Sequence, residues 1–133
     1  PGVLPVTRRV AERHGVAGRF TFVAGDLADA DFGAGHRVAT LGHILHSEGI
    51  ERSKALLKKA FAALAPGGWC AFSVEEGAPG EAYALSEVMR YRHDPEAAIR
   101  AAAEVGLELR LMRRATLRRE RGKDVAGVLF LFR

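Results

Sequence analysis

A strand–helix–strand pattern between residues 38 and 74 constrains the fold of this chain more than any other feature. Val38 to Leu45 is largely apolar and predicts a buried strand that runs into a turn or helix start. Ile50 to Leu64 repeats apolar residues at helical spacing, and Pro66-Gly67-Gly68 ends that helix. Trp69 to Val74 then predicts a second buried strand. Apolar strands joined by a crossover helix indicate an α/β sheet.

The residues before this pattern predict one helix and one short strand. Pro5 to His14 has a partly apolar helical face, and Gly15 is a plausible stop. Phe20 to Ala24 is rich in residues that favour strands and ends at Gly25. Ala28 to Gly35 is rich in Asp, Ala and Gly and predicts a loop.

The residues after this pattern predict two helices and a closing hairpin. Glu81 to Arg90 is a candidate short helix. Asp94-Pro95-Glu96 supplies an N-cap, a proline at the first helical position and an acidic first turn for a helix that ends at Gly106. Leu107 to Arg119 and Val125 to Phe132 predict two antiparallel strands. We therefore expect one domain over residues 1–133, with a sheet that ends in an antiparallel hairpin.

Composition narrows the class of protein. The single cysteine, Cys70, excludes an internal disulfide and a cysteine-built metal site, and we predict no metal site. No apolar run reaches the roughly 18–20 residues that a membrane helix needs. No secretory leader is visible in the sequence, so we expect a cytoplasmic protein without a membrane partner.

The net charge of +4 is concentrated near the predicted hairpin. One interpretation is a phosphate-binding surface, and the other is a solvated hairpin. No aromatic residues alternate with these arginines, as base stacking would require, so we favour the solvated hairpin over a nucleic-acid partner. The basic residues are Arg110, Arg113, Arg114, Arg118, Arg119, Arg121 and Lys123.

Two polar residues follow predicted strands, Asp26 in Gly25-Asp26-Leu27 and His46 in Ile44-Leu45-His46. Ligands of open α/β sheets bind at the carboxyl ends of strands, so we expect both side chains in one crevice. The alternatives are local. Asp26 can cap the turn that follows it, and His46 can start the helix at Ile50.

A third polar motif carries less weight. Asp31-Phe32-Gly33-Ala34-Gly35 spells an acidic residue followed by Gly-x-Gly, as in glycine loops that bind nucleotides. Such a loop follows an apolar strand and opens a helix. Here an apolar strand follows it instead, so we predict an ordinary loop.

The first half of the sequence resembles the O-methyltransferases that include plant caffeate-type and bacterial polyketide-tailoring enzymes. The resemblance lies in Arg19 to Leu27, in Leu41 to His46 and in Leu64 to Gly68. It implies a class I S-adenosylmethionine-dependent methyltransferase. The fold expected is then a partial Rossmann-like methyltransferase sheet with a carboxyl-terminal antiparallel hairpin.

The second half resembles a different branch, methyltransferases that are often fused to tetratricopeptide repeats. That resemblance lies in Phe72 to Glu75, in Arg90 to His93 and in the ending from Ala115 to Phe130. The chain is therefore similar to a natural or built hybrid of two related branches.

The resemblance implies roles for seven residues. In enzymes of this family, a carboxylate faces the adenine amino group, and the apolar residue after it packs on the adenine ring. The end of another strand lies along the cofactor. A histidine removes the proton of the acceptor hydroxyl. Two further side chains line the pocket of a small-molecule methyl acceptor. The implied residues are Asp26 and Leu27 for adenine, Leu41 and Gly42 for the cofactor backbone, His46 for the base, and Tyr91 and His93 for the acceptor.

Two departures from the family pattern accompany these roles. The first is that Ser47-Glu48 follows His46 where the plant enzymes have Asp-Trp. His43 is a weaker second candidate for the base. The glycine loop that grips the methionine part of S-adenosylmethionine, and the acidic residue for its ribose, would precede Pro1. We therefore expect residues 1–133 alone to bind this cofactor weakly or not at all.

Two functions follow from this incomplete pattern. The first is methyl transfer, with O-methylation of a small molecule by an incomplete catalytic domain. The alternative is a non-catalytic module of the same fold that associates with protein, including a second copy of itself, through an open sheet edge. The sequence alone does not decide between a methyltransferase and a non-catalytic module, and it does not establish whether the chain is active.

Overall fold

The computed structural model describes residues 2–133. The chain folds as two compact units, the first ending at Asp31 and the second spanning Phe32–Arg133. The sequence predicts a single domain over the whole chain, and that stays a prediction.

The first unit contains helix α1, Val3–Arg13, a 3-10 turn at Ala17–Arg19 and an extended segment after it. The predicted helix is confirmed. The strand predicted for Phe20 to Ala24 is wrong, because these residues form no ladder with any described strand. The segment pairs with no described strand, and the Phe20 side chain is 50% exposed, so neither a ladder nor burial stabilises a strand here.

The second unit is built on a sheet of six strands in the order β3-β4-β2-β6-β5, with β1 paired to β2. β1 and β4 run parallel to β2, whereas β6 runs antiparallel to both β2 and β5. The strands are β1 His36–Leu41, β2 Leu64–Glu76, β3 Tyr83–Leu85, β4 Tyr91–His93, β5 Leu109–Glu120 and β6 Lys123–Phe132. The predicted parallel crossover and the carboxyl-terminal hairpin are therefore confirmed.

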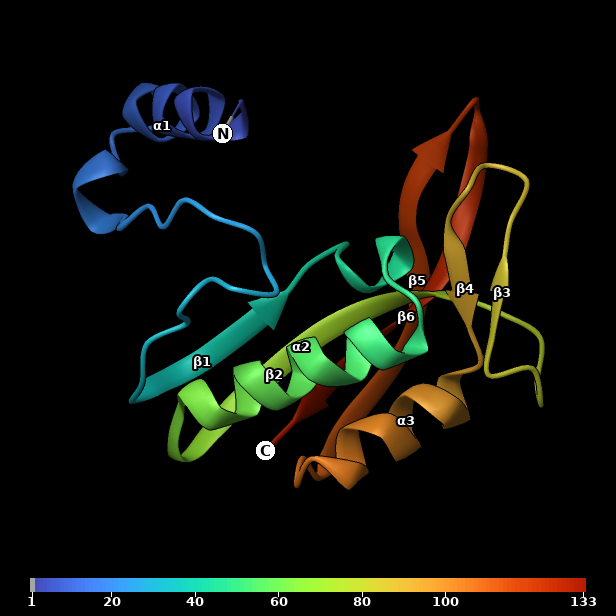
Figure 1. The fold of residues 1–133 in the computed structure, drawn as a ribbon. Coiled ribbons are helices and arrows are strands. Elements are labelled where there is room, and N and C mark those ends of the chain that lie inside the picture. The colour runs from blue at the N-terminus through green and yellow to red at the C-terminus, as the bar shows by residue number, and fades with distance from the viewer. Residues whose placement is uncertain (1) are drawn as a thin grey trace. The chain divides into compact units, whose positions relative to one another are not determined.

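Helices α2, Ile50–Ala63, and α3, Pro95–Glu104, lie across the same face of this sheet (Figure 1). The alternate residues of β2 and β6 that face the helices are fully buried, and the rings of Phe72 and Phe132 stack at 5.1 Å. Asp94 caps α3 as predicted, because its carboxylate accepts from the backbone N–H of Glu96. The sheet, α2 and α3 therefore share one hydrophobic core.

The turn between α2 and β2 explains the Pro66-Gly67-Gly68 motif. Gly67 has φ +73°, a left-handed conformation that favours glycine. A Cβ on Gly68 would lie 2.9 Å from the carbonyl oxygen of His36, so β1 passes too close for a side chain. The pairing of β1 with β2 also shifts register here, between His36 and Val38. The motif therefore both ends the helix and sets the approach of the two strands.

The short helix predicted for Glu81 to Arg90 is wrong. Tyr83–Leu85 forms strand β3 instead and pairs antiparallel with β4, and a tight turn joins the two strands. In that turn the backbone N–H of Ser86 donates to the carbonyl of Arg90 at 2.8 Å. Pairing with β4 outweighs the helical propensity of this segment, which has only enough residues for a marginal helix.

Three other predictions are settled by the described residues. Residues 28–35 form a loop before β1, so the Gly-x-Gly segment does not open a helix. Gly106 follows the end of α3 with φ +96°, as the predicted stop requires. In the part of the chain that the structure describes, no helix is long and apolar enough to cross a membrane.

Candidate functional site

The carboxyl ends of β1 and β2 meet at one edge of the second unit, where open α/β sheets bind their ligands. β1 ends at Leu41, and the chain then turns through Gly42 and His43 into a 3-10 turn, Leu45–Ser47, that carries His46. His43 takes up φ +54°, a conformation that histidine adopts more readily than most residues. The turn thus places two imidazoles at the end of β1, with ring centroids 5.8 Å apart.

The half-buried imidazole of His46 has a specific partner on the β3–β4 turn. Nη1 of Arg90 lies 2.8 Å from Nε2 of His46. A guanidinium has donors only, so Nε2 accepts this hydrogen bond and carries no proton. The ring is then neutral, with its proton on Nδ1.

Burial and charge both favour that neutral form. Burial lowers the pKa of His46 below its ordinary value, and the positive charge of Arg90 lowers it further, whereas the Glu75 carboxylate opposes the change. A neutral imidazole with a free-base nitrogen is the state that a general base requires. The nitrogen that would take the proton is, however, the one that Arg90 occupies.

The buried carboxylate of Glu75 is close enough to the His46–Arg90 pair to affect the pKa of His46. Glu75, near the end of β2, is 3% exposed, and its Oε1 lies 2.7 Å from Nη2 of Arg118 on β5. The same Nη2 lies 3.1 Å from Oε2 of Glu120. Oε1 of Glu75 and Nη1 of Arg118 have no aligned hydrogen-bond partner among the described residues. The contact is therefore an ion pair held by charge, with hydrogen-bonding capacity left unused.

His93 ties β4 to the turn that carries the candidate base. Its buried ring places Nε2 3.1 Å from the carbonyl oxygen of Leu45, to which the Nε2–H group donates. Burial lowers the pKa of His93, although this hydrogen bond opposes the change. Because Leu45 directly precedes His46, this hydrogen bond ties β4 to the turn that carries His46. The predicted contact of His93 with an acceptor stays a prediction.

The remaining predicted residues of the second unit lie around the same edge. Tyr91 is half-buried on β4, and its ring packs edge-on against Tyr83 with centroids 5.5 Å apart. The side chain of Leu41 belongs to the hydrophobic core. A Cβ added to Gly42 would meet nothing within 4 Å, so space is open above its backbone.

Asp26 and Leu27 belong to the first unit. Oδ1 of Asp26 accepts from the backbone N–H of Ala28 at 2.8 Å, which is the turn-capping contact weighed as an alternative. The carbonyl of Asp26 also accepts from the N–H of Ala30. Since His46 belongs to the second unit, the expected meeting of Asp26 and His46 in one crevice stays a prediction.

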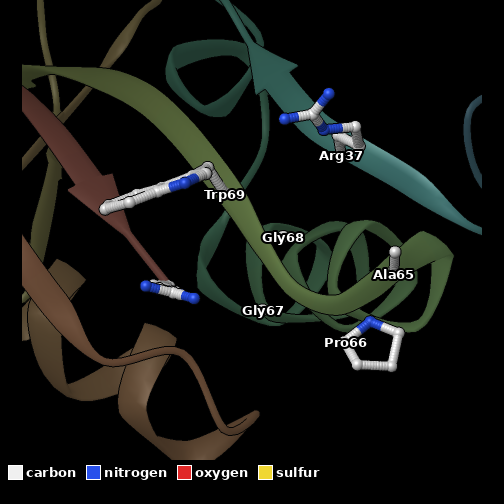
Figure 2. Close-up of a pocket in the computed structure, with 7 residues that line it drawn as sticks. Arg37, Ala65, Pro66, Gly67, Gly68 and Trp69 are labelled. Carbon is white, nitrogen blue, oxygen red and sulfur yellow. The ribbon is translucent and has the colours of Figure 1, made fainter.

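A surface hollow of about 240 Å³ lies at the other end of β1 and β2 (Figure 2). Arg37 reaches it from β1, and the residues from Ala65 to Trp69 line it from the start of β2. The guanidinium of Arg133 stacks over the Trp69 ring at 5.4 Å. The hollow is at the amino ends of these strands, opposite the end that carries His46.

Sequence reasoning missed three of the residues at the His46 edge. Glu75 had a usable signal, because a carboxylate at the end of a buried strand is the pattern that identified Asp26. Arg90 and Arg118 had none, because each is one arginine among many and its partner is distant in the sequence.

No protein-family model and no curated protein sequence matches the chain. Solved structures match closely in fold. A protein from Nostoc punctiforme assigned as an O-methyltransferase has a TM-score of 0.75 at 22% identity, covering 98% of this chain and 41% of that one. An O-methyltransferase family 2 protein from Planctomyces limnophilus, in complex with apigenin, has a TM-score of 0.75 at 19% identity, covering 99% and 40%.

A third structure shows both ligands of such an enzyme. It is an O-methyltransferase of neocarzinostatin biosynthesis in complex with S-adenosylhomocysteine and 1,4-dihydroxy-2-naphthoic acid. Its TM-score is 0.68 at 20% identity, and the match covers 93% of this chain and 37% of that one. The chain thus spans about 40% of the length of the first structures that it matches. The comparisons confirm a partial methyltransferase fold for this sequence.

Proposed function

We propose that this chain is the carboxyl-terminal part of an S-adenosylmethionine-dependent methyltransferase that methylates the hydroxyl of a small molecule. The observation that carries the proposal is the neutral imidazole of His46, at the carboxyl ends of parallel strands in a methyltransferase fold. Two of the matched structures are complexes with aromatic hydroxyl compounds, apigenin and 1,4-dihydroxy-2-naphthoic acid.

The chemistry expected of His46 is proton removal. S-adenosylmethionine supplies an electrophilic methyl group on a sulfonium sulfur. In the transfer, the acceptor oxygen forms a bond to the methyl carbon while the carbon–sulfur bond breaks and leaves a thioether. Nε2 of His46 takes the hydroxyl proton, so the product is a neutral methyl ether. Orientation of the hydroxyl toward the methyl group supplies much of the remaining rate.

Four residues are proposed for the cofactor, two in each unit. A carboxylate such as that of Asp26 is a suitable acceptor for an adenine amine. The Leu27 side chain is partly exposed and can cover a flat ring. The space above Gly42 admits close approach at the end of the strand after Leu41. Asp26 and Leu27 are proposed for the adenine, and Leu41 and Gly42 for the cofactor backbone; the methionine part would need further groups.

The test compares two proteins. One is residues 1–133, and the other is the product of the whole reading frame that contains this sequence. Both are titrated calorimetrically with S-adenosylmethionine and assayed for transfer of a labelled methyl group to phenolic acceptors. We expect weak or absent cofactor binding by residues 1–133, and transfer by the longer product that His46→Ala reduces by about 10²–10⁴-fold.

His14→Ala is the matched control, because His14 lies on the exposed end of α1. Absence of both cofactor binding and transfer in the product of the whole reading frame would refute the proposed function. Tight, stoichiometric binding by residues 1–133 would refute the division of the cofactor site.

The alternative is a non-catalytic module that associates through β1. Among the described strands, β1 pairs only with β2, and the side chain of Val38 on it is 58% exposed. An unpaired strand edge with apolar side chains invites pairing with another chain. Val38→Lys is expected to abolish such association, and Val3→Lys on α1 is the matched control. Light scattering that finds a monomer at all concentrations would exclude self-association.

A further inference from the structure

Among the described residues, the guanidinium of Arg90 is the charged group that hydrogen-bonds directly to the candidate base. Its Nη1 donates to Nε2 of a neutral imidazole, and it makes no ion pair with any carboxylate of residues 2–133. Two arginines of the β5–β6 hairpin show the more usual arrangement. Arg114 pairs with Glu76 at 2.7 Å, and Arg119 pairs with Asp124 at 3.0 Å. Arg90 is therefore a half-buried cation whose charge no carboxylate contacts directly.

The carboxylates nearest to Arg90 are already engaged. Glu120 is close enough for Arg90 to contribute to lowering its pKa, but the hydrogen bond from Arg118 is the main cause. Glu75 is buried against the same Arg118 guanidinium. Arg118 thus contacts both carboxylates, and neither forms an ion pair with Arg90 among the described residues. The Arg90 guanidinium can therefore take an anionic group of a bound ligand.

The turn that carries Arg90 is built to hold this geometry. The carbonyl of Arg90 accepts from the N–H of Ser86, and the hydroxyl of Ser86 accepts from the N–H of Arg90 at 3.3 Å. Met89, one residue before, takes up φ +57°, which is costly for a side chain of its kind. On the other side, His93 fixes the turn of His46 through Leu45. Each partner of the contact is thus held by hydrogen bonds other than the contact itself.

We propose that Arg90 is a specificity-determining residue that binds a carboxylate on the methyl acceptor, adjacent to the hydroxyl that is methylated. This inference rests on the proposed function and names its substrate class, an aromatic ortho-hydroxy acid. A guanidinium binds a carboxylate by two parallel charge-assisted hydrogen bonds, which are stronger than a bond to a neutral ring nitrogen. Binding of the acceptor therefore draws Arg90 away from Nε2 of His46.

The guanidinium and the imidazole are neighbours, so a ligand that reaches both must carry its carboxylate close to its hydroxyl. Nη1 and Nε2 lie 2.8 Å apart. In an ortho-hydroxy acid, the hydroxyl and carboxylate oxygens lie roughly 2.5–3.0 Å apart, the distance of an internal O–H···O hydrogen bond. One ligand can thus present its carboxylate to the guanidinium and its hydroxyl to the imidazole. An acceptor without the carboxylate leaves the base nitrogen occupied by Arg90.

The test measures binding without any methyl transfer. Residues 1–133 and the product of the whole reading frame are titrated with 2-hydroxybenzoate, benzoate and phenol. Nitrogen chemical shifts of the His46 ring report whether Nε2 loses its hydrogen bond. We expect 2-hydroxybenzoate to bind at least about tenfold more tightly than phenol and to shift Nε2, with phenol giving no shift.

Substitutions then assign the effect to Arg90. Arg90→Met is expected to remove the preference for 2-hydroxybenzoate, and Arg90→Lys to retain part of it, because a lysine keeps the charge but not the bidentate geometry. Arg100→Met, an exposed arginine on α3, is the matched control and should bind as the original protein does. A circular dichroism spectrum confirms that each variant is folded.

The outcomes separate this inference from the proposed function. Equal binding of phenol and 2-hydroxybenzoate, or an undiminished preference in Arg90→Met, overturns the role of Arg90 even if methyl transfer is observed. A preference that depends on Arg90 supports that role even if the transfer assay fails. Binding of benzoate as tight as that of 2-hydroxybenzoate overturns the requirement for an adjacent hydroxyl.

Discussion

Asp26 and His46 each follow a predicted strand in the sequence, but their hydrogen-bond partners in the structure lie at very different distances along the chain. The contact of Asp26 with Ala28 is local, two residues along the chain. His46 is held by Arg90, 44 residues away, and by a hydrogen bond between Leu45 and His93 that spans 48 residues. The hydrogen bond between Asp26 and Ala28 can form in an isolated peptide turn, whereas the contacts of His46 form only when the sheet is folded.

The largest expected effect tests whether the stability of the molecule resides in the second unit. Phe132 is 0% exposed between the sheet and the helices, and Phe132→Ala should lower the free energy of unfolding by about 3–5 kcal/mol. Phe20→Ala, at the half-exposed ring of the first unit, should cost less than about 1 kcal/mol. Urea unfolding measures both. If Phe132→Ala does not fold, Phe132→Leu gives a smaller loss, and equal losses at the two sites would contradict the comparison.

The next largest effect is expected at the ion pair between Glu75 and Arg118. Glu75→Gln leaves the Arg118 guanidinium without its buried partner and should cost about 3 kcal/mol. Asp124→Asn, which breaks the exposed pair with Arg119, is the matched control and should cost less than about 1 kcal/mol. Both variants are compared by urea unfolding. A loss at Glu75 no greater than at Asp124 would show that the pair contributes no more than a surface ion pair.

A smaller effect is expected in the dependence of stability on pH. Burial lowers the pKa of both His46 and His93 in the folded state, so the unfolded chain binds protons more readily than the folded one. The contribution of these groups is complete above about pH 6.5 and is lost as the pH falls through the lowered values. Unfolding free energies between pH 7.5 and 5 should decline, and His93→Gln should flatten the decline. His14→Gln is the control, and an unchanged slope in His93→Gln would exclude His93 as a source.

The smallest effect is expected at Asp26. Asp26→Ala removes the acceptor of the Ala28 N–H group at an exposed turn and should change the free energy of unfolding by less than about 1 kcal/mol. In the product of the whole reading frame, the same change should weaken S-adenosylmethionine binding if the adenine role is correct. Asp29→Ala, in the same turn, is the matched control. Equal cofactor affinity in both variants would leave Asp26 with a turn-capping role only.

Elements with local signals were predictable from the sequence. The cap and proline of Asp94-Pro95, the stop at Gly106 and the apolar stripe of α2 each act within a few residues, and all three appear in the structure. Phe20 to Ala24 failed because a strand requires a partner that local sequence does not reveal. Tyr83–Leu85 became a strand for the converse reason, since β4 supplies a partner.

The candidate site divides in the same way. His46 followed from its place after a strand, but the Arg90 contact and the Glu75–Arg118 pair join residues about forty positions apart. No spacing rule predicts which of many arginines meets a given carboxylate. His93 illustrates the difference, because the sequence placed it near the site and only the structure placed its ring against the carbonyl of Leu45.

Cys70 gives this molecule a built-in chemical reporter. Its thiol is fully buried in the middle of β2, and burial raises its pKa to about 11. Only a thiolate reacts readily with disulfide or maleimide reagents, so the folded chain resists labelling at neutral pH. The rate of labelling therefore measures how often β2 opens to solvent. This strand pairs with β1, which leads into the turn that carries His46. A ligand that binds at the edge of this sheet would be detected as protection of a thiol that it never touches.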